Sequence, residues 1–122
     1  MYNSNKFKDL KIKKPKLDII NINLPIYEFK VKSLVDSAHQ TLTSLQISLK
    51  IPNEVMRSFI EECLIVYNHV PYHNFSHGFS VFQVFHYFFK KSFLLNQIFS
   101  QDELFLGLIA CLSHDLGHRK FN

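Results

Sequence analysis

Apolar residues recur at steps of three and four positions along most of the chain after residue 28, which is the spacing of a single helix face. Sustained alternation of apolar and polar residues, which would indicate strands, is missing from the sequence, and no Asn-Gly or Asp-Gly turn separates two apolar runs. The sequence therefore predicts an all-α fold without an internal repeat. We expect its helices over residues 29–49, 53–69, 74–92 and 101–114.

Local signals indicate where some of these helices begin and end. Asn53 can cap the second helix, and Pro71 ends that helix because the residue before a proline is driven out of helical geometry. Ser100 and Glu103 have the spacing of a capping box immediately before an apolar run. The last helix should therefore begin at this box.

The core is expected to come from one face of each helix. The first helix offers Val31, Leu34, Val35, Ala38, Leu42, Leu45 and Leu49. The second offers Val55, Met56, Phe59, Ile60, Cys63, Leu64 and Tyr67. The third carries an aromatic stripe of Phe79, Phe82, Phe85 or His86, and Phe89. We interpret this stripe as core rather than as a ligand platform, and we expect residues 108–112 to lie deep in the core.

Two cysteines, Cys63 and Cys111, lie within apolar helical runs, where a free cysteine behaves as a small hydrophobe. They are predicted to be reduced core residues, which is typical of a cytoplasmic protein. The start of the chain lacks the apolar core of a signal peptide, and the longest apolar run, Leu104 to Leu112, is far shorter than the roughly 18 residues of a membrane helix. We therefore expect a soluble chain without a transmembrane segment.

The net charge of +4 belongs to one end of the chain. Six lysines and one aspartate lie in the first sixteen positions, whereas the remainder holds eight bases against nine acids. Residues 1–28 are predicted to be a basic, flexible arm without a compact element, and residues 29–122 a single folded unit. Because the arm lacks the interleaved aromatic residues of a single-strand binder, we expect no nucleic-acid partner.

The placement of the histidines suggests chemistry. An apolar helix that ends in His114 and Asp115 would have to desolvate an imidazole and a carboxylate, which is costly unless a metal ion binds both. His73 and His77 are four residues apart, so on a helix both would face the same way. The combination of His77 with His114 and Asp115 therefore favours a metal site.

The other histidines support a plainer interpretation. His39, His69 and His86, taken one at a time, are expected to be hydrogen-bonded packing residues, because a lone histidine near a core is more often structural than a ligand.

Two segments resemble the class I 3',5'-cyclic nucleotide phosphodiesterases. Residues 71–77, Pro-Tyr-His-Asn-Phe-Ser-His, with Val81, Gln83 and His86 after them, are similar to the first metal segment of that family. Residues 110–118, Ala-Cys-Leu-Ser-His-Asp-Leu-Gly-His, resemble its second metal segment, which also occurs among the wider HD-type metal phosphohydrolases. The 37-residue separation of the two segments is similar as well. The resemblance covers about residues 52–122 and implies the N-terminal portion of a helical bundle of the HD/phosphodiesterase type, truncated in this chain.

The resemblance implies a two-metal site. His77, His114 and Asp115 would bind the tightly held ion, which is expected to be Zn2+. Asp115 would also bridge to a second ion, expected to be Mg2+ or Mn2+. The rest of the catalytic domain would supply the remaining metal aspartate, the purine-binding glutamine and the hydrophobic clamp on the base.

The resemblance assigns three further residues near this site. His73 would be the general acid that protonates the leaving 3' oxygen, a role that suits an imidazole whose ordinary pKa is close to neutral. His118 would order water near the second ion, and Tyr72 would line the phosphate pocket.

The implied activity is hydrolysis of cyclic AMP, cyclic GMP or both to 5'-nucleoside monophosphates, in signal transduction. A hydroxide held between the two metal ions would attack the phosphorus in line. The protein would be cytoplasmic, or attached to a membrane through regions outside this chain.

The chain departs from the family pattern at three positions around the second ion. Ser80 stands where the family usually has an aspartate, Gly117 often corresponds to an acid, and Lys120 replaces a frequent glycine.

Two other functions stay open. The chain could be a non-catalytic module that binds a metal ion or a protein partner through its apolar faces. It could also be another HD-type phosphohydrolase that acts on linear nucleotides, although the Tyr72-His73-Asn74 segment argues against that class.

Overall fold

The computed structural model contains only helices among the residues that it describes, so the predicted all-α class is confirmed. The described residues are 17, 19, 23–46, 48–67 and 74–116. Their helices are the 3-10 turn η1 (Ile26–Glu28) and the α-helices α2 (Val31–Leu45), α3 (Asn53–Tyr67), α4 (Phe75–Lys91), α5 (Phe93–Ile98) and α6 (Gln101–Ser113).

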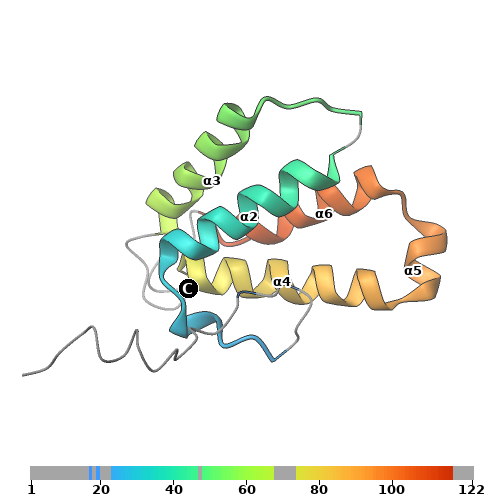
Figure 1. The fold of residues 1–122 in the computed structure, drawn as a ribbon, viewed down its shortest axis with the longest axis horizontal. Helices are drawn as coiled ribbons and strands as arrows, with labels where there is room; N and C mark the ends of the chain where they lie inside the picture. Colours follow the sequence, from blue (N-terminus) through green and yellow to red (C-terminus); the bar gives the residue numbers. More distant parts are fainter. Residues whose placement is uncertain (1–16, 18, 20–22, 47, 68–73, 117–122) are drawn as a thin grey trace, which may run out of the picture.

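Helices α4 and α6 form the centre of the fold and make the most extensive contact in it. Helix α2 packs against both of them and against α3, and the short α5 links α4 to α6 at one end (Figure 1). Because α5 reverses the chain, the start of α4 lies beside the end of α6. This pairing brings together the two segments that the sequence singles out for metal binding.

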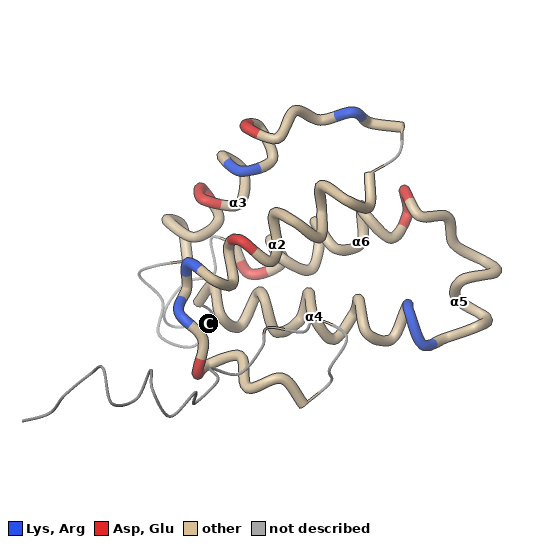
Figure 2. The backbone as a smooth tube through the Cα atoms, in the orientation of Figure 1, with Lys and Arg blue, Asp and Glu red and all other residues tan. Residues whose placement is uncertain are grey.

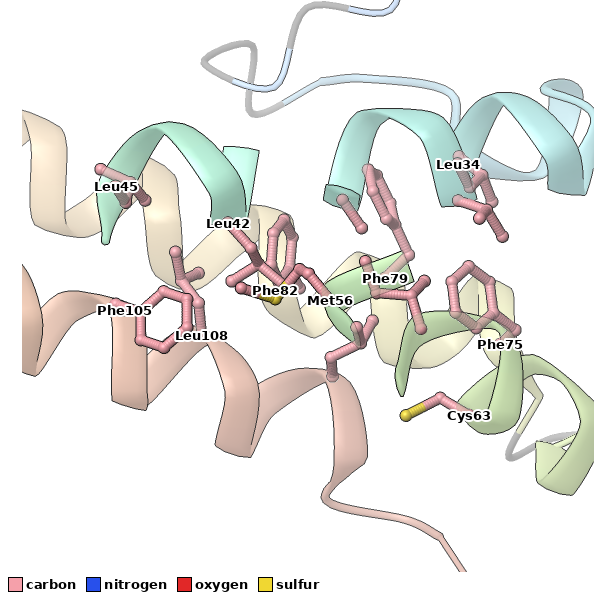
Figure 3. Packing of buried hydrophobic residues seen from close by; sticks show 14 of the residues in the cluster. Leu34, Leu42, Leu45, Met56, Cys63, Phe75, Phe79, Phe82, Phe105 and Leu108 are labelled. Atoms are coloured by element: carbon pink, nitrogen blue, oxygen red, sulfur yellow. The ribbon is translucent and has the colours of Figure 1, made fainter. Parts of the chain in front are cut away.

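The core lies between these four long helices (Figure 3). Phe79 and Phe82 of α4 are fully buried with their rings stacked at a centroid distance of 5.5 Å. Around them lie buried side chains from the other helices, including Leu34, Leu42, Met56, Ile60, Phe105 and Leu108. The stripe interpretation is therefore confirmed for Phe79, Phe82 and Phe89, and His86 rather than the more exposed Phe85 completes it.

The first helix is shorter than predicted, because it ends at Leu45 instead of residue 49. Gln46 closes the loop that follows: its side-chain amide donates to the Ile51 carbonyl at 2.8 Å, and its side-chain oxygen accepts from the Ile51 N–H at 2.9 Å. Lys50 has a φ of 50°, which a continuing helix cannot contain. The predicted core positions Val31 and Leu49 are exposed as a result of lying at and beyond the helix ends.

The second helix begins one residue earlier than a cap at Asn53 would require. The Met56 N–H donates to the Pro52 carbonyl at 3.0 Å, so Asn53 is already the first helical residue. Val55, predicted for the inner face, is exposed, whereas Phe59 and Leu64 are partly buried against the core. The inner face is therefore narrower than the apolar pattern suggested.

Helix α5 is not anticipated by the sequence pattern. None of its six residues is buried, so it has no apolar stripe that periodicity could detect. Its one local signal is Ser92, whose hydroxyl caps the helix by accepting from the Leu95 N–H at 3.1 Å.

The capping box of Ser100 and Glu103 at the start of α6 is confirmed. The expectation that all of residues 108–112 are deep in the core is wrong. Leu108 and Leu112 are fully buried, but Ala110 between them is exposed because α6 presents only one face to the core.

The expectation of no compact element before Phe29 is also wrong. Leu24 and Ile26 are buried at η1, and the Gln83 side-chain amide donates to the Ile19 carbonyl at 2.9 Å. Among the described residues before α2, η1 therefore contacts α4, and Leu24 and Ile26 belong to the core. Residues 1–16, with the six lysines, lie outside the described residues, and the unit boundary at residue 28 stays a prediction.

Charge is excluded from the middle of the fold. The bodies of α4 and α6 carry no lysine, arginine, aspartate or glutamate between their ends (Figure 2). None of the helices in the described part of the chain combines the length and apolarity needed to cross a membrane.

Candidate metal centre

The first turn of α4 positions His77. Asn74 lies at the N-cap, where its side-chain oxygen accepts from the His77 N–H at 2.9 Å. This bond satisfies one of the free N–H groups at the helix start and fixes the backbone of His77. The sequence Asn-x-x-His therefore places an imidazole beside a defined helix end.

The end of α6 positions the other two side chains. The helix ends at Ser113, His114 is its C-cap, and the Leu116 N–H donates to the Ser113 carbonyl at 3.1 Å to close a turn. Asp115 lies inside this turn. Its carboxylate is only 14% exposed and points at the first turn of α4.

The structure brings His77, His114 and Asp115 together. One carboxylate oxygen of Asp115, Oδ2, lies 3.3 Å from Nε2 of His77 and 3.0 Å from Nε2 of His114. The two imidazole rings are 5.4 Å apart between centroids, and the three candidate ligand atoms lie within 4.8 Å of one another. No other group of three such residues occurs among the described residues.

A hydrogen bond defines which nitrogen of His114 faces this group. Nδ1 lies 2.7 Å from the Cys111 carbonyl, and because a carbonyl oxygen only accepts, Nδ1 carries the proton. A neutral His114 then turns the lone pair of Nε2 toward the Asp115 carboxylate. Two acceptors 3.0 Å apart repel each other unless a proton or a cation lies between them.

The donor set fits a divalent metal ion. Two imidazole nitrogens and one carboxylate oxygen form the three-ligand pattern of catalytic zinc sites, in which a fourth position stays open. Bonds of about 2.0–2.2 Å in tetrahedral geometry place ligand atoms roughly 3.3 Å apart. The two nitrogen–oxygen separations, 3.0 and 3.3 Å, agree with that spacing, and all three ligand atoms lie within 4.8 Å of one another.

Several predicted site residues cannot be placed. His73, Tyr72 and His118 lie outside the described residues. Ser80, where the family usually has an aspartate, lies one helical turn after His77 and borders a hollow formed with residues 24–28. It does not belong to the candidate ligand group.

The histidines that were predicted to be packing residues are not part of this group. His39 Nε2 is 3.1 Å from the Asn53 carbonyl, which joins α2 to α3 as expected of a packing histidine. His86 is buried in the core stripe, but its Nδ1 has no hydrogen-bond partner among the residues that the structure describes. Burial, with Lys90 adding to it, lowers the pKa of His86. His69 lies outside the described residues.

One residue beside the site escaped the sequence reasoning. Tyr67 was expected only as an apolar position of the second helix, yet its hydroxyl is hydrogen-bonded to the turn that carries Asp115. A tyrosine at the last position of a helix, ten residues before His77 in the sequence, is the signal that could have indicated a polar role.

Comparison with known proteins shows which sequences this chain resembles. Residues 72–122 match the family model of 3'5'-cyclic nucleotide phosphodiesterases. The chain is 36% identical over 72 residues to the high affinity cGMP-specific 3',5'-cyclic phosphodiesterase 9A of Drosophila melanogaster, covering 59% of this chain and 5% of that protein. It is 40% identical over 74 residues to the 3',5'-cyclic-nucleotide phosphodiesterase regA of Dictyostelium discoideum, covering 60% of this chain and 9% of that protein. No solved structure matches the chain.

Proposed function

Because its residues 72–122 are similar in sequence to the 3',5'-cyclic nucleotide phosphodiesterases, we propose that this chain supplies the first metal-binding part of a site that hydrolyses 3',5'-cyclic nucleotides. The observation that carries the proposal is that the Nε2 atoms of His77 and His114 both lie close to the same carboxylate oxygen of Asp115. The names of both relatives support cyclic nucleotides as the substrate class. Since the chain spans under a tenth of either relative, the activity proposed is that of a longer protein.

The ions proposed for the site are Zn2+, which His77, His114 and Asp115 would hold, and Mg2+ or Mn2+ as a second ion that Asp115 would also help to hold. When bound, such ions lower the pKa of water and neutralise charge on phosphoryl oxygens.

The chain's own residues would prepare and complete the reaction. The Nδ1–H of His114 donates to the Cys111 carbonyl. This hydrogen bond fixes the ring and leaves Nε2 as the nitrogen that can bind a metal ion. A water molecule would lose one proton to the solvent, and its oxygen would form the new bond to phosphorus while the bond from phosphorus to the 3' oxygen breaks. His73, outside the described residues, is proposed to give a proton to that leaving oxygen, so the products are a 3' hydroxyl and a 5' phosphate.

A chimaera tests this function. Residues 72–122 would replace the matching segment of the Dictyostelium relative, and hydrolysis of cyclic AMP and cyclic GMP would be measured with Zn2+ and Mg2+ present. We expect turnover in the chimaera, its loss in His77→Ala and His73→Ala, and its retention in Tyr87→Phe, a variant of α4 outside the ligand group.

Two outcomes would overturn the proposal. A folded chimaera that binds zinc but hydrolyses neither nucleotide would favour the non-catalytic metal-binding module. A chimaera that hydrolyses linear but not cyclic nucleotides would favour another class of HD-type phosphohydrolase.

A further inference from the structure

We infer that Tyr67 is a positioning residue whose hydroxyl holds the Asp115 carboxylate in place for metal binding. The inference rests on the proposed function, because it assigns Tyr67 a role toward the ion held by His77, His114 and Asp115. Tyr67 lies on α3, which contributes no candidate ligand.

The hydroxyl of Tyr67 bridges two backbone groups at the end of α6. It donates to the Leu112 carbonyl at 2.8 Å and accepts from the Asp115 N–H at 3.2 Å. The Tyr67 residue is only 1% exposed, so water cannot readily take over either bond. A single buried oxygen therefore connects the last turn of the helix to the residue that carries the carboxylate.

These bonds explain why the chain leaves the helix where it does. If α6 continued, the Asp115 N–H would donate to the carbonyl four residues earlier, which belongs to Cys111. That carbonyl is 2.7 Å from His114 Nδ1 instead, and Tyr67 receives the Asp115 N–H. These two hydrogen bonds replace the one that a continuing helix would make. They turn residues 114–116 out of the helix and direct the side chains of His114 and Asp115 toward His77.

The position of the hydroxyl is itself fixed by packing. The ring of Tyr67 meets the ring of Phe75 edge-on, with centroids 6.5 Å apart. Gly78, next to His77, leaves the room that the hydroxyl occupies: a Cβ there would lie 3.3 Å from the Tyr67 oxygen and 3.0 Å from the Leu112 carbonyl oxygen. Helices α3, α4 and α6 thus meet at one polar point beside the candidate site.

The test is Tyr67→Phe, which keeps the ring and removes only the hydroxyl, with Tyr87→Phe as the matched control. Cobalt binding to the full chain would be followed by the visible absorption of the bound ion, and zinc affinity by competition with a chromophoric chelator. We expect about a 10- to 100-fold loss of affinity and a changed cobalt spectrum in Tyr67→Phe, as is typical when a group that orients a ligand is removed. Tyr87→Phe should match the wild type.

A second measurement separates this inference from the proposed function. Hydrogen exchange of the Asp115 amide is measured without metal, and it should be protected in the wild type and faster in Tyr67→Phe. If the wild type binds no metal, the proposed function is overturned, and so is the role of Tyr67 in metal binding. If the wild type binds metal but Tyr67→Phe leaves the affinity, the spectrum and the Asp115 exchange unchanged, the inference alone is overturned.

Discussion

Replacing Gly78 by alanine should loosen the junction between α4 and the end of α6. The added methyl group would lie 3.0 Å from the Leu112 carbonyl oxygen and 3.3 Å from the Tyr67 ring and hydroxyl. The nearest of these neighbours is helix backbone, which cannot rotate away. Gly107 offers a matched control, because its added methyl would lie 2.7 Å from the end of the Phe85 side chain, and Phe85 is 37% exposed, so that side chain has room to shift.

The expected magnitude follows from three opposing effects. Alanine in place of glycine inside a helix stabilises it by about 1 kcal/mol. Overpacking a site that cannot yield costs about 1–3 kcal/mol, and weakening the hydrogen bond from Tyr67 to Leu112 costs about 1 kcal/mol more. Gly78→Ala should therefore destabilise the protein by about 1–3 kcal/mol, whereas Gly107→Ala should be within about 1 kcal/mol of the wild type.

The assay is equilibrium urea unfolding followed by far-ultraviolet circular dichroism, with zinc affinity measured on the same samples. We expect Gly78→Ala to unfold at lower urea and to bind zinc more weakly than Gly107→Ala. If Gly78→Ala were as stable as Gly107→Ala and bound zinc as tightly as the wild type, the close approach of α4 to Leu112 would be refuted.

Three further predictions concern the core and the helix ends. Because the pKa of buried His86 is lowered below that of the unfolded chain, the unfolded state takes up the proton first. The stability from neutral His86 should be full above the unfolded pKa, about 6.5, and lost as the pH falls below it, so the wild type should lose more stability than His86→Leu between pH 7 and 5 in urea unfolding; an equal or smaller loss in the wild type would contradict this. Burial raises the pKa of Cys63 from 9.0 to about 11, so in the native state at pH 8 its thiol should react with a disulfide reagent about 100-fold more slowly than an ordinary thiol, and rapid native labelling at Cys63 would contradict its burial. Ser100→Ala removes the hydroxyl of the capping box and should cost about 1 kcal/mol in urea unfolding, while an unchanged midpoint would show that α6 does not need its cap.

Much of the fold follows from local chemistry in the sequence. The long helices were predicted because each buries one apolar face, and the box at Ser100 was predicted because its bonds join residues three apart. Helix α5 was not, because none of its residues is fully buried and only Leu95 packs partly against the core. The burial of Leu24 and Ile26 was missed for a different reason: their contacts with α4 are made far along the chain, and a short apolar stretch next to Pro25 has no helical period to detect.

The candidate site also has one part that the sequence predicts and one part that it does not. His77, His114 and Asp115 were singled out because a polar pair ends an apolar helix and because two segments resemble a known family. The place of Tyr67 at the end of a helix indicates a polar role at most. The partner of its hydroxyl could not be predicted, since that partner is an amide 48 residues away and only the packing of three helices brings the two together. Residue type and spacing indicate ligands, but the groups that orient those ligands depend on tertiary contacts.

The central claim, that His77, His114 and Asp115 form one metal site, is tested most directly by zinc stoichiometry. Purified chain would be loaded with zinc, dialysed and analysed for metal content, alongside His77→Ala, His114→Ala and Asp115→Asn. His39→Ala, which removes a histidine outside the group, is the control. We predict one zinc ion per chain in the wild type and in His39→Ala, and its loss in each of the three ligand variants while their helical content is kept. A folded wild type without zinc, or zinc that survives in all three variants, would contradict the account.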